Sequence, residues 1–340
     1  VAAAGVVVDT AVLPAGLANY TAFRIPGVVA TRSAVVVVAE GRFYGCDDFY
    51  GLHTIVSRRS LDGGVTWLPL QVVADPVALF ECANASLPAS GRCQFWDPTP
   101  LWDANTNTLH LLAAYASSDD HSGRLGGHQA LFHWVSKDEG ATWSAPQNLT
   151  SSFPHIPRPT PANGHGIQLR SGRLLSPAYG EGFGPGAQSL AFLSDDHGAS
   201  WRLSADSVGP DTGEGSVAQL PNGTLIYNLR NDNSSEAGCG GVAHCRQQAV
   251  SNDGGDHWGN LVSQPGLPDP ECKGGVASMS ASQPWVVYAN DASTSSRTNV
   301  TLTLSPDGGS AFSWRTVVSE AGGYADVIAL DAATAAVAYE

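Results

Sequence analysis

Short apolar runs separated by turn-forming residues are the main pattern along this chain. The clearest runs cover residues 34–39, 109–114, 129–135, 224–229 and 300–304. Runs of this length, rich in Val, Leu and aromatic residues and bounded by Gly, Pro, Asn or Asp, are typical of β-strands. The three-and-four spacing of apolar residues that marks an amphipathic helix is nearly absent. The pattern therefore predicts an all-β fold.

One turn-like pattern, Ser-x-Asp-x-Gly-x-Thr/Ser-Trp, recurs along the chain. Its five copies begin at Ser60, Ser136, Ser194, Ser251 and Ser305. The fourth copy has His257 in place of Thr, and the fifth has two extra residues before Trp314. In a tight turn Asp accepts backbone N–H groups and Gly supplies a positive φ. We expect each Trp to enter the next strand and fill the core, so these residues are interpreted as structural rather than catalytic.

The spacing of the repeat indicates how the strands are organised. Successive copies start 76, 58, 57 and 54 residues apart, along a chain of 340 residues. Five such turns predict a six-bladed β-propeller of four-stranded antiparallel blades, as a single domain over residues 1–340. The sixth blade would lack the turn or be completed by both termini.

Composition excludes two classes of protein. The longest apolar run, at 34–39, has six residues, whereas a membrane-spanning helix needs about 20. A net charge of −14 cannot supply the basic face of a nucleic-acid-binding protein. Only Lys137 and Lys273 among the 17 basic residues are lysines. Since Arg favours bidentate recognition of carboxylates, an Arg cluster here would mark an anion site.

Cysteines and glycosylation triplets favour a secreted or extracellular protein. The chain has an even number of cysteines and no Cys-x-x-Cys pattern. Six Asn-x-Ser/Thr triplets begin at Asn19, Asn84, Asn148, Asn222, Asn233 and Asn299. The start at Val1, without Met, fits removal of a leader. Short spacings suit the disulfides Cys82–Cys93 and Cys239–Cys245, which leaves Cys46–Cys272 by elimination.

Residues outside the repeat carry a more specific signal. Phe23-Arg24-Ile25-Pro26 precedes the first repeat, and Glu40-Gly-Arg42 is followed by Cys46-Asp47-Asp48. Further along come Gly213-Glu214-Gly215 with Arg230, then Arg297, Gly322-Gly323-Tyr324 and the closing Tyr339-Glu340. The repeat matches the turn known as the Asp box. With this turn and these motifs in this order, the chain resembles the sialidase (neuraminidase) superfamily over nearly its whole length. Asp boxes alone are not specific, because other propellers contain them.

The resemblance implies a role for each of these residues. It makes Arg24, Arg230 and Arg297 the triad that binds the substrate carboxylate, with Glu340 holding Arg24 and Arg42 near the ring hydroxyls. It also makes Asp48 the acid/base, Tyr324 the nucleophile and Glu214 the base that activates Tyr324. Asp47 is an alternative to Asp48, and Arg246 to Arg230. Asp97 is interpreted as a contact to O4 or the acyl group of the sugar.

The proposed substrate explains why these residue types are suited to the chemistry. Sialic acid carries a carboxylate on its anomeric carbon, which fixed guanidinium groups can bind. That carboxylate would repel a carboxylate nucleophile, whereas a neutral phenol avoids the repulsion if a base removes its proton. Retaining glycosidases ordinarily use two carboxylates, and sialidases with a tyrosine nucleophile are a known exception.

The sequence thus predicts an exo-α-sialidase that retains configuration and acts on sialylated glycans, glycoproteins or glycolipids. Alternatives are a hydrolase of deaminated neuraminic acid, a trans-sialidase, or an inactive Asp-box lectin or receptor. Phe49, Tyr50 and Trp96 are candidates to line an N-acetyl pocket, with Asp97 and Arg42 on its polar side, which favours N-acetylneuraminic acid. We expect a monomer that uses no cofactor. We also expect no metal site, since the ten His residues show no His-Glu-x-x-His pattern.

Overall fold

The computed structural model describes residues 9–48, 51–80, 92–118, 128–154, 160–180, 186–232, 239 and 244–340. Strands dominate these residues, as the apolar runs predict. The described part contains a single α-helix, α1 (Pro76–Phe80), and two short 3-10 turns, Leu17–Asn19 and Thr150–Ser152. None of its helices is long and apolar enough to span a membrane.

The first three blades use the strands up to residue 203. The first contains β1 (Ala22–Ala30), β2 (Val35–Arg42), β3 (Gly51–Ser60) and β4 (Gln71–Ala74). The second contains β5 (Arg92–Asp103), β6 (Thr108–Ser118), β7 (His128–Ser136) and β8 (Gln147–Asn148). The third contains β9 (Thr160–Pro161), β10 (Ile167–Gln168), β11 (Leu174–Gly180), β12 (Gln188–Ser194) and β13 (Arg202–Leu203). Its innermost strand is interrupted, because β9 and β10 both pair with β11.

The last three blades follow in the same way. The fourth contains β14 (Thr212–Gln219), β15 (Leu225–Asn231), β16 (Cys245–Ser251) and β17 (Val262–Pro268). The fifth contains β18 (Gly275–Ser278), β19 (Val286–Asp291), β20 (Thr298–Ser305) and β21 (Trp314–Ala321). The sixth shows two strands among the described residues, β22 (Ala325–Ala329) and β23 (Ala335–Tyr339).

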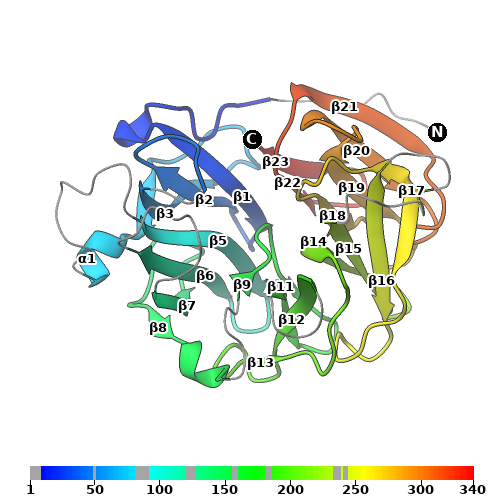
Figure 1. Cartoon of the computed structure of the whole chain (residues 1–340), viewed down its shortest axis with the longest axis horizontal. Coiled ribbons are helices and arrows are strands. Elements are labelled where there is room, and N and C mark those ends of the chain that lie inside the picture. Colours follow the sequence, from blue (N-terminus) through cyan, green and yellow to red (C-terminus); the bar gives the residue numbers. More distant parts are fainter. Residues whose placement is uncertain are drawn as a thin grey trace.

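These sheets surround a central axis and form a six-bladed β-propeller (Figure 1). Pairing within the blades is antiparallel, and a short parallel pairing of β3 with β5 joins the first two blades. The ring closes where β22 contacts β18 on one side and β1 on the other. The sixth blade has no Asp-box turn, as the repeat spacing predicts.

Packing between blades explains the continuous apolar run at 35–38. All eight residues of β2 are buried. Alternate side chains face opposite neighbours, because successive residues of a strand point to opposite sides of the sheet. Val36 packs in a cluster with Leu109 of the second blade, whereas Val37 packs with Ile328 of the sixth. A strand buried on both faces therefore shows an apolar run instead of alternation.

The Asp-box turns have the hydrogen bonds that their residue types predict. In the first turn Asp62 Oδ1 accepts the N–H of Thr66 at 2.8 Å, and Oδ2 accepts its hydroxyl at 2.6 Å. These bonds lower the pKa of Asp62 to about 2. The expectation that every Trp fills the core is only partly confirmed. Trp201 is buried, but Trp314 at the start of β21 is 37% exposed.

Strand direction separates the Asp-box turns from the predicted site residues. All five turns connect the third and fourth strands of their blades. Arg24 and Glu214 lie near the starts of first strands, whereas Arg42 and Arg230 lie near the ends of second strands. In antiparallel blades these positions share one edge of the propeller, here called the site edge. The turns lie at the other edge, here called the Asp-box edge.

A buried charge cluster lies between the inner strands. Asp326 on β22 is fully buried, and its Oδ1 lies 3.1 Å from Lys273 Nζ and 2.9 Å from His165 Nδ1. Its Oδ2 accepts the backbone N–H of Val28 on β1 at 3.0 Å. A Cβ at Gly164 would lie 2.0 Å from Lys273 Nζ, so only glycine fits beside the cluster. The Asp326 carboxylate, which belongs to the sixth blade, therefore contacts residues of the first, third and fifth blades.

Replacing Asp326 with Ala should destabilise the protein strongly. The variant leaves buried Lys273 without its carboxylate, and breaking such a pair costs about 3–5 kcal/mol of unfolding free energy. Burial opposes ionisation of Asp326, but His165 and Lys273 hold its pKa below the ordinary value. The stabilisation is therefore present above about pH 4 and is lost on further acidification. Urea unfolding at pH 7 and pH 3 measures both effects.

The exposed Glu320 on β21 provides the control for this experiment. Glu320→Gln removes one negative charge and should change the unfolding free energy by less than about 0.5 kcal/mol. Equal stability of Asp326→Ala and Glu320→Gln would contradict the assigned importance of the cluster.

Candidate active site

Tyr324 and Glu214 face each other at the site edge. Tyr324 immediately precedes β22 and Glu214 lies in β14, and each is only 6% exposed. The Tyr324 hydroxyl donates a hydrogen bond of 2.5 Å to Glu214 Oε1. Burial, and next the charge of Glu214, raise the pKa of Tyr324 well above 10. The phenol is therefore neutral, with a proton acceptor already in contact.

Three guanidinium groups surround this tyrosine. Arg24 Cζ and Arg297 Cζ each lie 5.3 Å from the centroid of the Tyr324 ring. Arg230 Nη1 donates to the Tyr324 hydroxyl at 3.3 Å and to Glu214 Oε2 at 3.0 Å. Residues from the first, fourth, fifth and sixth blades thus meet around one phenol, as the resemblance implies.

Arg24 is held from two sides. Its Nη2 lies 3.1 Å from Glu340 Oε2, and its Nη1 lies 2.7 Å from Asp48 Oδ1. Ile25 has a φ of 59°, and the register of β1 against β2 shifts between Arg24 and Gly27. This bulge directs the N–H of Ile25 to Glu340 Oε1 at 2.8 Å. The closing Glu340 therefore fixes both the side chain and the backbone at Arg24.

Arg42 lies beside Arg24 but deeper. It is 1% exposed, and its Nη2 lies 2.6 Å from Glu40 Oε2. Its Nη1 lies 2.7 Å from the same Asp48 oxygen that contacts Arg24. Burial alone would raise the pKa of Glu40, but Arg42 and then His53 lower it to about 2. Glu40 is therefore ionised and fixes the Arg42 guanidinium.

Asp97 lies in the wall of the same site. It has a φ of 52° at a bulge in β5, and it is 3% exposed. Tyr179 donates to its Oδ2 at 2.7 Å, and the Asn163 amide donates to its Oδ1 at 3.1 Å. Burial, followed by Glu214 and Glu40, raises the pKa of Asp97 well above the usual range. Tyr179 and Asn163 were not identified from the sequence, because their signal is a contact between blades rather than a motif.

Asp291 lies close to the predicted nucleophile Tyr324. The side chain is buried, and its Oδ1 accepts the N–H of Gly323, next to Tyr324, at 3.2 Å. Burial raises the pKa of Asp291 to about 6. Asp291 thus anchors the backbone that leads into Tyr324, close to Arg297.

The geometry distinguishes Arg230 from Arg246, one of the alternatives that the sequence left open. Arg230 contacts Tyr324 and Glu214, whereas Arg246 is buried in the fourth blade. Arg246 Nη1 donates to the Cys272 carbonyl at 2.8 Å, so it supports the scaffold behind the site. The Asp48 carboxylate forms ion pairs with both Arg24 and Arg42. Phe49 and Tyr50, two candidates for the N-acetyl pocket, lie outside the described residues, and Trp96 is half-buried.

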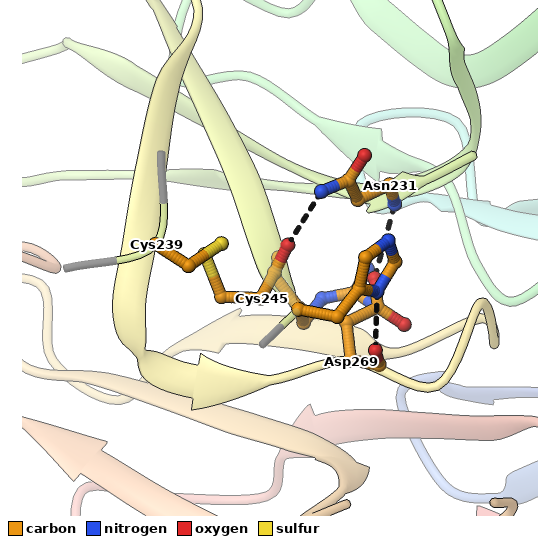
Figure 2. Close-up of a disulfide and its surroundings, with 6 residues drawn as sticks. Asn231, Cys239, Cys245 and Asp269 are labelled. Atoms are coloured by element: carbon orange, nitrogen blue, oxygen red, sulfur yellow. Dashed lines mark hydrogen bonds and ion pairs between the residues drawn. A yellow bond between two sulfur atoms is a disulfide. The ribbon is translucent and has the colours of Figure 1, made fainter. Parts of the chain in front are cut away.

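The disulfide predictions have different outcomes. The Cys239–Cys245 bridge is present (Figure 2). Cys93 is disulfide-bonded, and its predicted partner Cys82 lies outside the described residues. The Cys46–Cys272 pairing is wrong, since both cysteines are free. Cys46 is in an exposed loop, whereas Cys272 is buried against Ile25 and Tyr324, so the two thiols lie in different environments.

The described residues do not form a metal site. No group of three or more His, Cys, Asp or Glu residues among them could hold a metal ion. His133 belongs instead to a stacked pair with His110, joined by a 2.9 Å contact between ring nitrogens. Burial lowers the pKa of His110 to about 3 and of His133 to about 4.

Comparisons with known proteins agree with this arrangement. The model of the BNR repeat-like domain family matches residues 53–334. Sialidase-2 of Cricetulus griseus is 31% identical over 313 residues, covering 83% of this chain and 77% of that protein. The chain belongs to the sialidase superfamily. Among solved structures, a Hadza microbial sialidase superposes with a TM-score of 0.83 at 24% identity, covering 96% of this chain and 65% of that one.

Two bacterial relatives are much longer than this chain. The sialidase of Micromonospora viridifaciens is 29% identical over 316 residues, covering 86% of this chain but 46% of that protein. The corresponding share for the sialidase of Bacteroides fragilis is 55%. The chain thus spans about half the length of these two curated relatives. An intramolecular trans-sialidase from Ruminococcus gnavus shares the fold, with a TM-score of 0.78 at 18% identity, covering 97% of this chain and 92% of that one.

Proposed function

We propose that this chain is the catalytic propeller of a retaining exo-α-sialidase that hydrolyses terminal α-linked sialic acids. One observation supports the proposal most directly. The buried Tyr324 donates a hydrogen bond to Glu214 and is surrounded by Arg24, Arg230 and Arg297. If the anomeric carbon of a sialic acid lies above that phenol, the guanidinium groups balance the charge of the attached carboxylate. The Tyr324 oxygen is then within reach of the anomeric carbon as a nucleophile.

Binding of the substrate would first displace Asp48. One oxygen of the Asp48 carboxylate contacts both Arg24 and Arg42, and the side chain is 48% exposed. The substrate carboxylate can replace Asp48 as the partner of Arg24, and charge-assisted hydrogen bonds contribute about 1.5–3 kcal/mol each. Asp48 would then be free to approach the leaving oxygen from its exposed loop.

The covalent step follows from the contacts of Tyr324. Its oxygen attacks the anomeric carbon while Glu214 accepts the phenolic proton and Asp48 donates a proton to the leaving alcohol. Arg230 lowers the pKa of Tyr324 against the effects of burial and Glu214, so it favours the developing phenolate. Water, deprotonated by Asp48, then releases the sugar, and Glu214 returns the proton to Tyr324. Two displacements retain the configuration.

Recognition at C5 of the sugar is the finer part of the proposal. Trp96 is half-buried beside Asp97, whose carboxyl is hydrogen-bonded to Tyr179 and Asn163. An apolar side chain next to a polar group suits an N-acetyl substituent, in which a methyl group adjoins an amide. We therefore propose N-acetylneuraminic acid in preference to its deaminated analogue.

Replacing Tyr324 with Phe should abolish turnover while leaving the fold intact. Hydrolysis of the fluorogenic α-ketoside of N-acetylneuraminic acid should lose at least about three orders of magnitude in kcat, because no covalent intermediate can form. A fluorinated sialosyl donor should add its mass to Tyr324 in the wild-type protein.

The α-ketoside of the deaminated analogue, assayed in parallel, tests recognition at C5.

Tyr288→Phe is the matched control, since it removes another buried hydroxyl, one bonded to Gln248. This variant should keep wild-type kcat. Labelling at a residue other than Tyr324 would sink the mechanism. Binding of the sugar without any hydrolysis by the wild type would instead favour the lectin alternative.

Replacing Asp48 with Asn should impair formation of the covalent intermediate mainly when the leaving group needs an acid. For a sialoside with an alkyl leaving group, kcat/KM should fall by about 10²–10⁴-fold, the usual contribution of general acid catalysis. With a nitrophenyl leaving group, which departs without protonation, the loss should be much smaller. Equal losses on both substrates would assign Asp48 to binding rather than to proton transfer.

We also propose that the chain folds in an oxidising compartment and is secreted. The Cys239–Cys245 bridge and the exposed triplets at Asn19, Asn148 and Asn222 support this proposal. Protein from its native source should carry glycans at these three asparagines and keep the bridge. Peptide mass spectrometry with and without glycosidase treatment measures both, and a fully unmodified, reduced protein would contradict the proposal.

A further inference from the structure

Arg230 has a second carboxylate partner that sequence analysis did not identify. Its Nη1 faces Glu214 and Tyr324, whereas its Nε forms an ion pair of 2.6 Å with Asp232 Oδ1. The Asp232 side chain is 27% exposed, so the pair is partly shielded from water. The guanidinium therefore lies between the predicted base and a carboxylate without an assigned role.

The position of Asp232 is built into the fourth blade. It follows β15 directly, and its N–H donates to the Asp211 carbonyl at 2.9 Å. A Cβ at Gly213 would lie 2.5 Å from Asp232 Oδ2. A side chain at position 213 would therefore push the carboxylate away from its present place, which makes Gly213 part of this arrangement.

The chain between Arg230 and Asp232 is anchored as well. Asn231 Nδ2 donates to the carbonyl of Cys245 at 3.0 Å, and its backbone N–H donates to Asp269 Oδ2 at 3.0 Å (Figure 2). Cys245 is in turn bridged to Cys239. The disulfide and the buried Asp269 thus hold the backbone so that residues 230 and 232 keep their relative positions.

We propose that Asp232 is a positioning residue that holds the Arg230 guanidinium in place for the substrate carboxylate. This inference rests on the proposed function. Without Asp232, Glu214, at 3.0 Å, is the charged partner that the described residues leave to Arg230. The guanidinium would turn toward Glu214 and away from the sugar, so substrate binding would weaken more than the chemical step.

Charges around Asp232 make this effect dependent on pH. Burial raises the pKa of Asp232, Arg230 lowers it, and Glu214 and Asp269 raise it, so that the pKa lies at about 6. Asp232 therefore loses its negative charge as the pH falls through about 6. The KM of the wild type should rise in that range, as the ion pair that holds Arg230 is lost.

The test is steady-state kinetics of Asp232→Asn on the fluorogenic α-ketoside of N-acetylneuraminic acid. We expect KM to rise about 10-fold at pH 7, which is the loss of about 1.4 kcal/mol of binding, with a smaller fall in kcat. Asp232→Glu should recover part of the loss. The rise in KM below pH 6 should be smaller in Asp232→Asn than in the wild type, although Asp291, whose pKa is also about 6, remains to titrate.

Two further variants keep the test decisive. Gly213→Ala displaces the Asp232 carboxylate without removing its charge, and should raise KM at least about 3-fold even if Asp232→Asn does not fold. Asp256→Asn removes a similarly exposed, Arg-paired carboxylate at the Asp-box edge, with ion pairs to Arg173 and Arg202. It should leave KM unchanged.

The outcomes separate this inference from the proposed function. If the wild type hydrolyses the ketoside and Tyr324→Phe does not, but Asp232→Asn and Gly213→Ala keep KM within twofold, the positioning role is wrong and the proposed function stands. If the wild type has no activity, the proposed function itself fails. Equal effects of Asp232→Asn and Asp256→Asn would show a general charge effect and overturn the inference.

Discussion

The buried carboxylate of Asp326 is the interaction on which the arrangement of the blades depends most. It accepts the N–H of Val28 on β1 and contacts Lys273 and His165, so it joins the first, third and fifth blades to the sixth. A charge in such surroundings is stable only when every partner is in place. Because Tyr324 lies two residues before Asp326, the contact that closes the ring also sets the position of the proposed nucleophile.

Charge pairing also explains how a chain with a net charge of −14 can present a cationic site. Each buried or half-buried guanidinium at the site has its own carboxylate partner. The pairs are Arg24 with Glu340, Arg42 with Glu40 and Arg230 with Asp232. These carboxylates fix the orientation of the guanidinium groups and offset the repulsion between neighbouring cations. Asp48 contacts both Arg24 and Arg42 and adds a further negative charge.

Irregular backbone places the site residues where regular strands would not. Ile25 and Asp97 have positive φ values, and register shifts occur beside Arg24, Asp97 and Glu214. A bulge redirects a side chain relative to the strand, and such features concentrate near active sites. The regular strands pack the blades against each other, and the bulges direct the functional groups into the site.

Local sequence patterns determined the strand runs, the Asp-box turns and the blade number, because these depend on contacts within a few residues or on a repeat. The candidate site residues came from the resemblance to the sialidase superfamily. Local patterns also supported the Cys239–Cys245 bridge, which closes a short loop. Tertiary structure alone decided that Cys46 and Cys272 stay apart, that Arg246 is scaffold, and that Asp232, Tyr179 and Asp326 belong to the site or its support. Their partners lie on other strands or other blades, and pairings across such distances leave no periodic or spaced signal along a single chain.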